Sequence, residues 1–105
     1  MARLAEEMAA EIGMELAVRL RRVSKEDIER LLAGTVRAEV EEVEEGLYQV
    51  TLIDAETGRP FLLVVYTFNP SWVSPVTYMG HGILDLDLLR KHYEKAMELL
   101  RASQG

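Results

Sequence analysis

The sequence predicts an α+β fold with two N-terminal helices, a four-stranded antiparallel meander and a C-terminal helix packed on the sheet, in the order ααββββα. Three observations lead to this prediction. Apolar residues recur at the helical period near both ends of the chain. Two short segments, each with Gly before a new apolar run, have the sequence of β-hairpin turns. The run from Pro60 to Phe68 is apolar at odd and even positions alike, as in a central strand covered on both faces.

The first helix is expected over about residues 2 to 22, where an apolar residue recurs at every fourth position. The apolar residues are Leu4, Met8, Ile12, Leu16 and Leu20, and the small residues Ala5, Ala9, Gly13 and Ala17 run beside them. Gly13 lowers helix stability by roughly 1 kcal/mol relative to Ala. We therefore expect a backbone, a ring or a ligand to approach it closely, and packing on the sheet is the favoured reason.

The two other helices are predicted from their capping residues. Ser24 and Asp27 resemble a capping box at the start of a short second helix. Asp85 or Asp87 is expected to cap the last helix, which continues to about Ala102. Two antiparallel helices thus precede the sheet, and one follows it.

Two hairpins define the register of the sheet. Val43–Leu47 and Ala55–Arg59 each fit a type I turn closed by a left-handed Gly, which pairs the end residues of each segment. Counting back from these pairs assigns every strand residue to a face. One face receives Val36, Ala38, Val40, Tyr48, Val50, Leu52, Leu62, Val64, Tyr66 and Phe68, and this apolar set is expected to face the core. The back face receives Arg37, Glu39, Glu41, Gln49, Thr51, Ile53, Phe61, Leu63 and Val65.

The segment 69–75 contains two X-Pro pairs and is predicted to be a loop. A fourth strand over about residues 76 to 83 then pairs with the third. If Phe68 pairs with Val76, the core-face residues are Tyr78, Gly80 and Gly82, and the back-face residues are Met79, His81 and Ile83. A shift by one residue reverses these assignments. The first register is favoured because it places the two glycines beneath a helix.

Length and composition exclude several function classes. A chain of 105 residues is expected to form one domain, residues 1–105. Its net charge of −6 argues against nucleic acid as a partner. The chain has no Cys, and its two His lack metal-ligand spacing, so no disulfide, metal or cofactor is predicted. The acidic N-terminus and the absence of a long apolar run predict a soluble, cytoplasmic protein that does not enter a membrane.

The leading functional hypothesis is a small-molecule-binding domain. The register places Glu42, Tyr48 and Tyr66 in one cross-strand row, at the end of the sheet where the loop carries the only Trp, Trp72. Aromatic rings with a few polar groups at a sheet end match the anatomy of a pocket for a small apolar or aromatic ligand. The predicted lining residues are Tyr48, Tyr66, Phe68, Trp72 and Tyr78. An aromatic plug at the end of a small core is the alternative explanation.

Two further hypotheses belong to other function classes. An enzyme, either a hydrolase or an acid–base catalyst, would use His81 or Glu42 in the same pocket. Both residues also have structural explanations, since Glu42 lies at the sheet rim and His81 on the back face. An interaction module would form a homodimer through an apolar patch on the back face, which needs a helix or a second subunit as cover. This patch consists of Ile53, Phe61, Leu63 and Val65.

Two resemblances accompany these hypotheses. The order of elements is similar to that of helix-grip folds without their first strand, and such folds enclose hydrophobic ligands. The hairpins Asp54–Pro60 and Val43–Leu47, the capped helices and the absence of Cys resemble the style of computationally designed proteins. Proteins of thermophiles share the richness in Arg, Glu and Leu, and the irregular 69–83 segment is unlike an idealised design, so natural and designed origins both stay open.

Overall fold

The computed structural model describes residues 4–20, 25–32, 34–73 and 75–102. Its elements are α1 (Ala5–Leu20), α2 (Lys25–Leu31), β1 (Val36–Glu44), β2 (Leu47–Asp54), β3 (Pro60–Phe68), β4 (Val76–Ile83) and α3 (Leu86–Ala102). The strands form one antiparallel sheet in the order β1-β2-β3-β4, which confirms the predicted α+β meander. Ser24 and the side chains of Leu20 and Asp27, which the helix predictions used, lie outside the described part of the chain.

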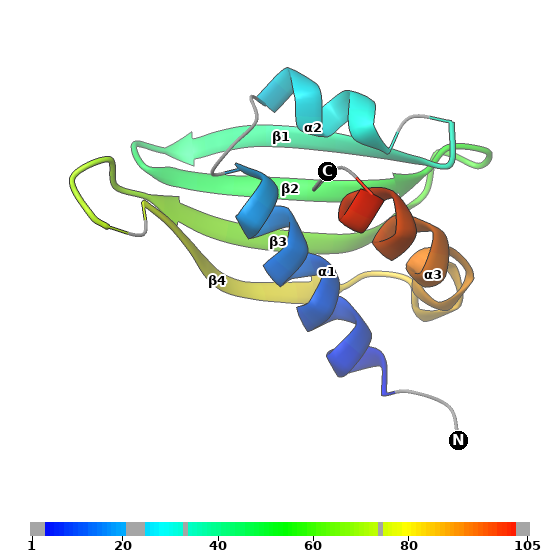
Figure 1. Cartoon of the computed structure of the whole chain (residues 1–105). Coiled ribbons are helices and arrows are strands. Elements are labelled where there is room, and N and C mark those ends of the chain that lie inside the picture. Colours follow the sequence, from blue (N-terminus) through cyan, green and yellow to red (C-terminus); the bar gives the residue numbers. More distant parts are fainter. Residues whose placement is uncertain (1–3, 21–24, 33, 74, 103–105) are drawn as a thin grey trace.

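All three helices cover the same face of the sheet, which we call the helix face (Figure 1). α1 crosses β3 and β4, α2 lies along β1, and α3 packs against α1 and β3. The C-terminal helix therefore shares its face with α1. No described helix covers the other side of the sheet, which we call the open face.

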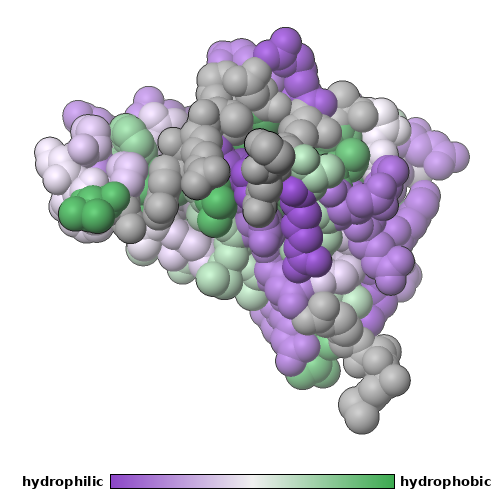
Figure 2. All heavy atoms as spheres, in the orientation of Figure 1, coloured by the Kyte–Doolittle hydropathy of each residue, from purple (hydrophilic) through white to green (hydrophobic). Residues whose placement is uncertain are grey.

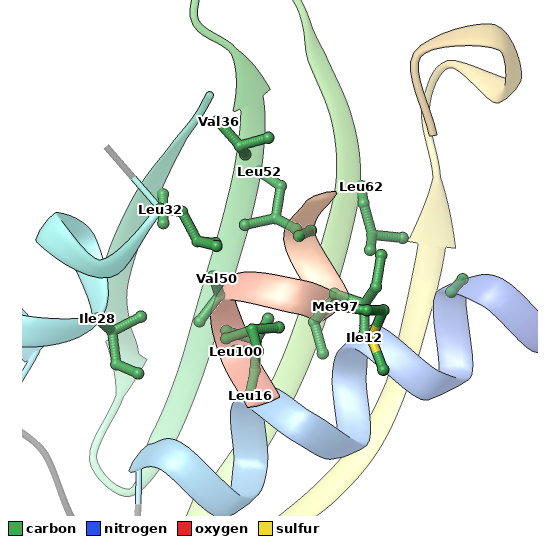
Figure 3. Close-up of a cluster of buried hydrophobic side chains, with 14 of the residues drawn as sticks. Ile12, Leu16, Ile28, Leu32, Val36, Val50, Leu52, Leu62, Met97 and Leu100 are labelled. Carbon is green, nitrogen blue, oxygen red and sulfur yellow. The ribbon is translucent and has the colours of Figure 1, made fainter. Parts of the chain in front are cut away.

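The core fills the space between the helices and the helix face (Figure 3). α1 supplies Ile12 and Leu16, and the central strands supply side chains such as Val50, Leu52 and Leu62, all of them fully buried. Burying one such aliphatic side chain contributes about 1.5–3 kcal/mol relative to leaving it in water. The predicted core face of the central strands is thus correct along most of its length.

The predicted register holds through the middle of the sheet. At the first turn Leu47 pairs with Glu44, because the register shifts between Glu42 and Glu44, so the predicted Val43–Leu47 pair is wrong. Gly46 and Gly58 have φ angles of 77° and 76°, as the two hairpin turns require. Glu42 lies opposite Tyr48, Tyr48 opposite Tyr66, and Tyr66 opposite Tyr78, so one row crosses all four strands.

Because of a β-bulge at Met79, the predicted faces are wrong in the second half of β4. The register shifts between Tyr78 and Gly80, because Met79 is one extra residue on that strand. Beyond it the pairs are Val65 with Gly80, Val64 with His81, Leu63 with Gly82 and Leu62 with Ile83. His81 and Ile83 therefore lie on the helix face, and Gly80 and Gly82 on the open face. The prediction was wrong for these four residues because a bulge reverses the side-chain alternation.

A second register shift, between β2 and β3, makes the predicted face of Phe61 wrong. Ile53 pairs with Pro60 whereas Leu52 pairs with Leu62, which leaves Phe61 as the extra residue. Its side chain is fully buried, and its ring stacks on His92 of α3 with 5.3 Å between ring centroids. Phe61 thus belongs to the helix face, and the predicted back-face patch loses its largest member.

Candidate functional site

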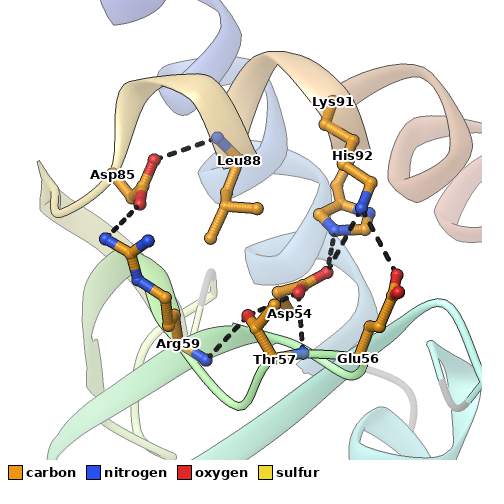
Figure 4. A network of polar contacts seen from close by, with 8 residues as sticks. All are labelled: Asp54, Glu56, Thr57, Arg59, Asp85, Leu88, Lys91 and His92. Atoms are coloured by element: carbon orange, nitrogen blue, oxygen red, sulfur yellow. Dashed lines mark hydrogen bonds and ion pairs between the residues drawn. The ribbon is translucent and has the colours of Figure 1, made fainter.

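The β2–β3 hairpin is joined to α3 by a hydrogen-bond network around Asp54, the hairpin network (Figure 4). The Asp54 carboxylate accepts hydrogen bonds from the Thr57 amide at 2.9 Å and the Thr57 hydroxyl at 2.6 Å. Nε2 of His92 lies 2.6 Å from the same carboxylate, and Nζ of Lys91 lies at 3.9 Å. Hydrogen bonds from Thr57, and next from His92, lower the pKa of Asp54 to about 2.

The same network fixes the start of α3. Asp85 accepts a hydrogen bond from the Leu88 amide at 3.1 Å, so it is the predicted helix cap. Its other oxygen lies 3.1 Å from the guanidinium of Arg59 in the hairpin. The contact of His92 with Asp54 and that of Asp85 with Arg59 both join the β2–β3 hairpin to α3. Holding these two elements together is sufficient to explain the network.

His81 forms a different arrangement at the edge of the sheet, the Tyr78–His81–Glu6 chain. The hydroxyl of Tyr78 is hydrogen-bonded to Nδ1 of His81, and the two rings are nearly parallel. Nε2 of His81 lies 2.6 Å from the carboxylate of Glu6, in the first turn of α1. The bulge at Met79 makes this chain possible, because it brings residues 78 and 81 to the same face.

Gly13 creates the space that this chain occupies. A Cβ atom at position 13 would lie 2.5 Å from Cε2 of Tyr78, closer than real contacts allow. The carbonyl of Gly13 accepts a hydrogen bond from the hydroxyl of buried Tyr66 at 3.1 Å. The predicted close approach to Gly13 is confirmed, and the approaching group is an aromatic ring of β4.

The electrostatics of the chain define its proton positions. Burial raises the pKa of Tyr78, and the Glu6 carboxylate raises it further, so the phenol keeps its proton at neutral pH. A carboxylate at Nε2 requires a proton on that nitrogen, which leaves Nδ1 of a neutral His81 to accept from Tyr78. The arrangement is a hydrogen-bonded relay of phenol, imidazole and carboxylate, in which His81 is placed as a base toward the phenol.

A second candidate site is the aromatic end, formed by Tyr48, Phe68 and Trp72 at the β3–β4 loop. The rings of Tyr48 and Phe68 meet edge to face with 6.4 Å between centroids. Phe68 is 41% exposed, Trp72 58% and Val73 102%. Figure 2 shows hydrophobic atoms at this outer end of the sheet. Large apolar side chains gathered in water are a typical sign of a binding surface.

The loop that carries Trp72 is held by its own hydrogen bonds. The amide of Asn69 donates to the carbonyl of Pro75 at 2.7 Å, and the side chain of Asn69 accepts from the Ser71 amide at 3.0 Å. The amide of Phe68 donates to the carbonyl of Gly46 at 2.8 Å, which ties this end of β3 to the β1–β2 turn. Trp72 therefore extends from a segment whose described residues are held by hydrogen bonds at Asn69.

The structure divides the five predicted lining residues into two groups. Tyr66 is 1% exposed and belongs to the core, and half-buried Tyr78 is engaged by Gly13 and His81. The other three form the aromatic end.

Of the two catalytic candidates, exposed Glu42 accepts a hydrogen bond from the Gly46 amide at 3.3 Å. Burial raises the pKa of Tyr48, and a hydrogen bond to Glu42 adds to this shift.

Glu6 is the residue of the chain that sequence reasoning missed. It lies 75 positions from His81, and its first-turn position in a helix is explained by the helix dipole alone. Only the packing of α1 on β4 joins the two residues. The local signal that existed was Gly13, which marked where a ring approaches the helix.

Other kinds of site receive less support. Within residues 4–20, 25–32, 34–73 and 75–102, no group of three His, Asp or Glu side chains is arranged to hold a metal ion. No helix in that part of the chain is long and apolar enough to cross a membrane. Arg19 is buried at the end of α1, where its guanidinium lies 3.8 Å from Glu15 one turn earlier.

Comparison with protein-family models, curated proteins and solved structures finds no match to this chain.

Proposed function

We propose that the protein binds a small, planar, apolar molecule at the aromatic end. The observation that carries this proposal is the exposure of Phe68 and Trp72, which leave 41% and 58% of their surfaces in water at the same end of the sheet. Contact with a flat ligand would remove apolar surface from water at about 25 cal/mol per Å². The net charge of −6 favours a neutral or cationic ligand over an anionic one.

Preorganisation of the surface supports this proposal. The 69–75 turn is closed by a backbone hydrogen bond, and Tyr48 packs against Phe68. A ligand that binds to the Tyr48–Phe68 ring pair, which is already in place, avoids the cost of ordering these two rings. Because Phe68 and Trp72 are exposed, the ligand would bind on an open aromatic surface.

The direct test is a titration of Trp72 fluorescence with neutral and cationic aromatic compounds. Trp72 is the only Trp in the chain, so its emission reports on the aromatic end alone. We expect a saturable change with one class of compound, and Phe68→Ala should raise its Kd by roughly tenfold. Leu84→Ala is the matched control, because Leu84 is 53% exposed at the opposite end of the sheet. An unchanged spectrum across the panel would remove the proposal.

A second candidate function is acid–base or hydrolytic catalysis at the Tyr78–His81–Glu6 chain. It is favoured by one observation, the contact of both His81 ring nitrogens with an oxygen. Activity toward a panel of small esters would be compared between the wild type, His81→Ala and Glu42→Gln. Loss of turnover in His81→Ala, with Trp72 titrations unchanged, would support catalysis at this chain. Equal rates in all three proteins would count against it.

A further inference from the structure

On the open face, β3 carries the apolar side chains of Leu63 and Val65, and β2 carries Thr51 and Gln49 beside them. Leu63 and Val65 of β3 are half-buried on this face, and Ile53 of β2, which pairs with Arg37, is 5% exposed. Phe61, which the sequence placed here, has moved to the helix face, yet no described helix has taken over the cover of this side. We propose that a second copy of this chain packs on the open face, which forms a two-fold symmetric dimer.

The two edges of the open face differ in height. On β1 the face carries the long, exposed side chains of Arg37, Glu39 and Glu41. On β4 it carries Gly80 and Gly82, which have no side chains. A Cβ atom built at either glycine meets no atom within 4 Å, so β4 is bare toward this side at these two positions. The face is thus tall along β1 and low on β4 at Gly80 and Gly82, beyond the bulged Met79.

The high edge of one copy can fit against the low edge of a second copy. A two-fold axis parallel to the strands, in the plane between two facing sheets, places β1 of one copy over β4 of the other. The long side chains of Arg37, Glu39 and Glu41 then lie over the bare glycine backbone of the second copy. Leu63 and Val65 of each copy then lie over β2 of the other copy, on either side of the two-fold axis. The charged groups reach the rim and the apolar groups are buried, which is the usual anatomy of an interface.

The available area is sufficient for such a dimer. Strands spaced about 4.8 Å apart, with a rise of about 3.3 Å per residue, give a four-stranded face of roughly 500 Å² per copy. Two facing copies therefore bury on the order of 1,000 Å², which is the lower limit for a specific interface. A dimer at this limit dissociates on dilution, so the oligomeric state is expected to depend on concentration.

The glycines also provide a test that leaves the fold intact. Neither Gly80 nor Gly82 has a positive φ, and each has room for a side chain, so Val at both positions suits an edge strand. The double variant Gly80→Val/Gly82→Val should keep or raise the melting temperature of the monomer. In the dimer the added side chains would fill the space that β1 of the second copy needs. We expect its dimer Kd to rise by roughly tenfold or more.

The measurement is sedimentation equilibrium over a range of concentrations, on the full chain of 11.9 kDa. Met14→Lys is the matched control, since Met14 is 60% exposed on α1, on the other side of the molecule from the open face. A concentration-dependent dimer that weakens in the glycine variant and persists in Met14→Lys would support the proposal. A monomer at every concentration would overturn it, as would a dimer that Met14→Lys disrupts and the glycine variant does not.

Discussion

His92 and His81 each hold a carboxylate through Nε2 at 2.6 Å, yet the two pairs lie in opposite surroundings. The side chains of His92 and Asp54 are 9% and 1% exposed, whereas those of His81 and Glu6 are 15% and 77% exposed. Asp54 also accepts two hydrogen bonds from Thr57. The same bond length thus occurs in a sealed structural network and at an open edge.

Solvent decides how much each pair contributes to stability. Removing one partner of a buried pair leaves the other without its hydrogen bonds, and water cannot replace them. An exposed pair exchanges its partner for water and contributes about 0–1 kcal/mol. The exposure of the carboxylate, and not the length of the bond, therefore separates a structural histidine from one that is available for chemistry.

The largest expected effect comes from Asp54→Asn. Asn keeps the shape of Asp but replaces one acceptor oxygen with a donor, so Thr57 or His92 loses its partner. We expect the melting temperature to fall by on the order of 10 °C in thermal denaturation followed by circular dichroism.

Glu6→Gln makes the same chemical change at the exposed pair and is the matched control. Its melting temperature should change by no more than about 4 °C. Similar losses in both variants would show that exposure does not distinguish the two histidines, and the comparison would fail.

Acid should have the next largest effect, and it should act through Asp54. The folded-state pKa of Asp54 is about 2, below the ordinary value of 3.8. A lowered pKa contributes stability that is complete above the ordinary value and is lost as the pH falls toward 2. The wild type should therefore lose stability between about pH 4 and pH 2 more steeply than Asp54→Asn. Parallel pH profiles from chemical denaturation would contradict this assignment.

The contrast between regular turns and bulges explains how much of the fold could be predicted. Gly46 and Gly58 allowed the two turns to be predicted, because a left-handed backbone position favours Gly. Counting residues back from these turns then gave the row through Tyr48 and Tyr66. The extra residues at Phe61 and Met79 left no such local sign. Their positions depend on tertiary packing, as when the Phe61 ring finds His92 of α3.

The candidate sites were harder to predict for the same reason. Trp72 and Phe68 were placed correctly at the loop end, because prolines and strand pairing define that end. His81 was assigned to the wrong face by one extra residue, so its contacts with Tyr78 and Glu6 were not expected. A histidine contact that spans 75 positions is determined by how a helix packs, and periodicity within one strand does not contain that information.

Tyr78→Phe should have a small effect on stability and the most specific effect on His81. The ring still fills the space beside Gly13, so only the hydrogen bond to Nδ1 is lost, at about 0.5–1.5 kcal/mol. In the wild type, Glu6 and Tyr78 together hold the proton of neutral His81 on Nε2, and nitrogen NMR of the ring at a pH where His81 is neutral measures that preference. The variant should show a mixture of both tautomers, because Nδ1 no longer has a donor facing it. A ring that stays wholly in the Nε2 form would show that Glu6 alone orients His81, and the chain would then lack the coupling that acid–base chemistry through Tyr78 requires.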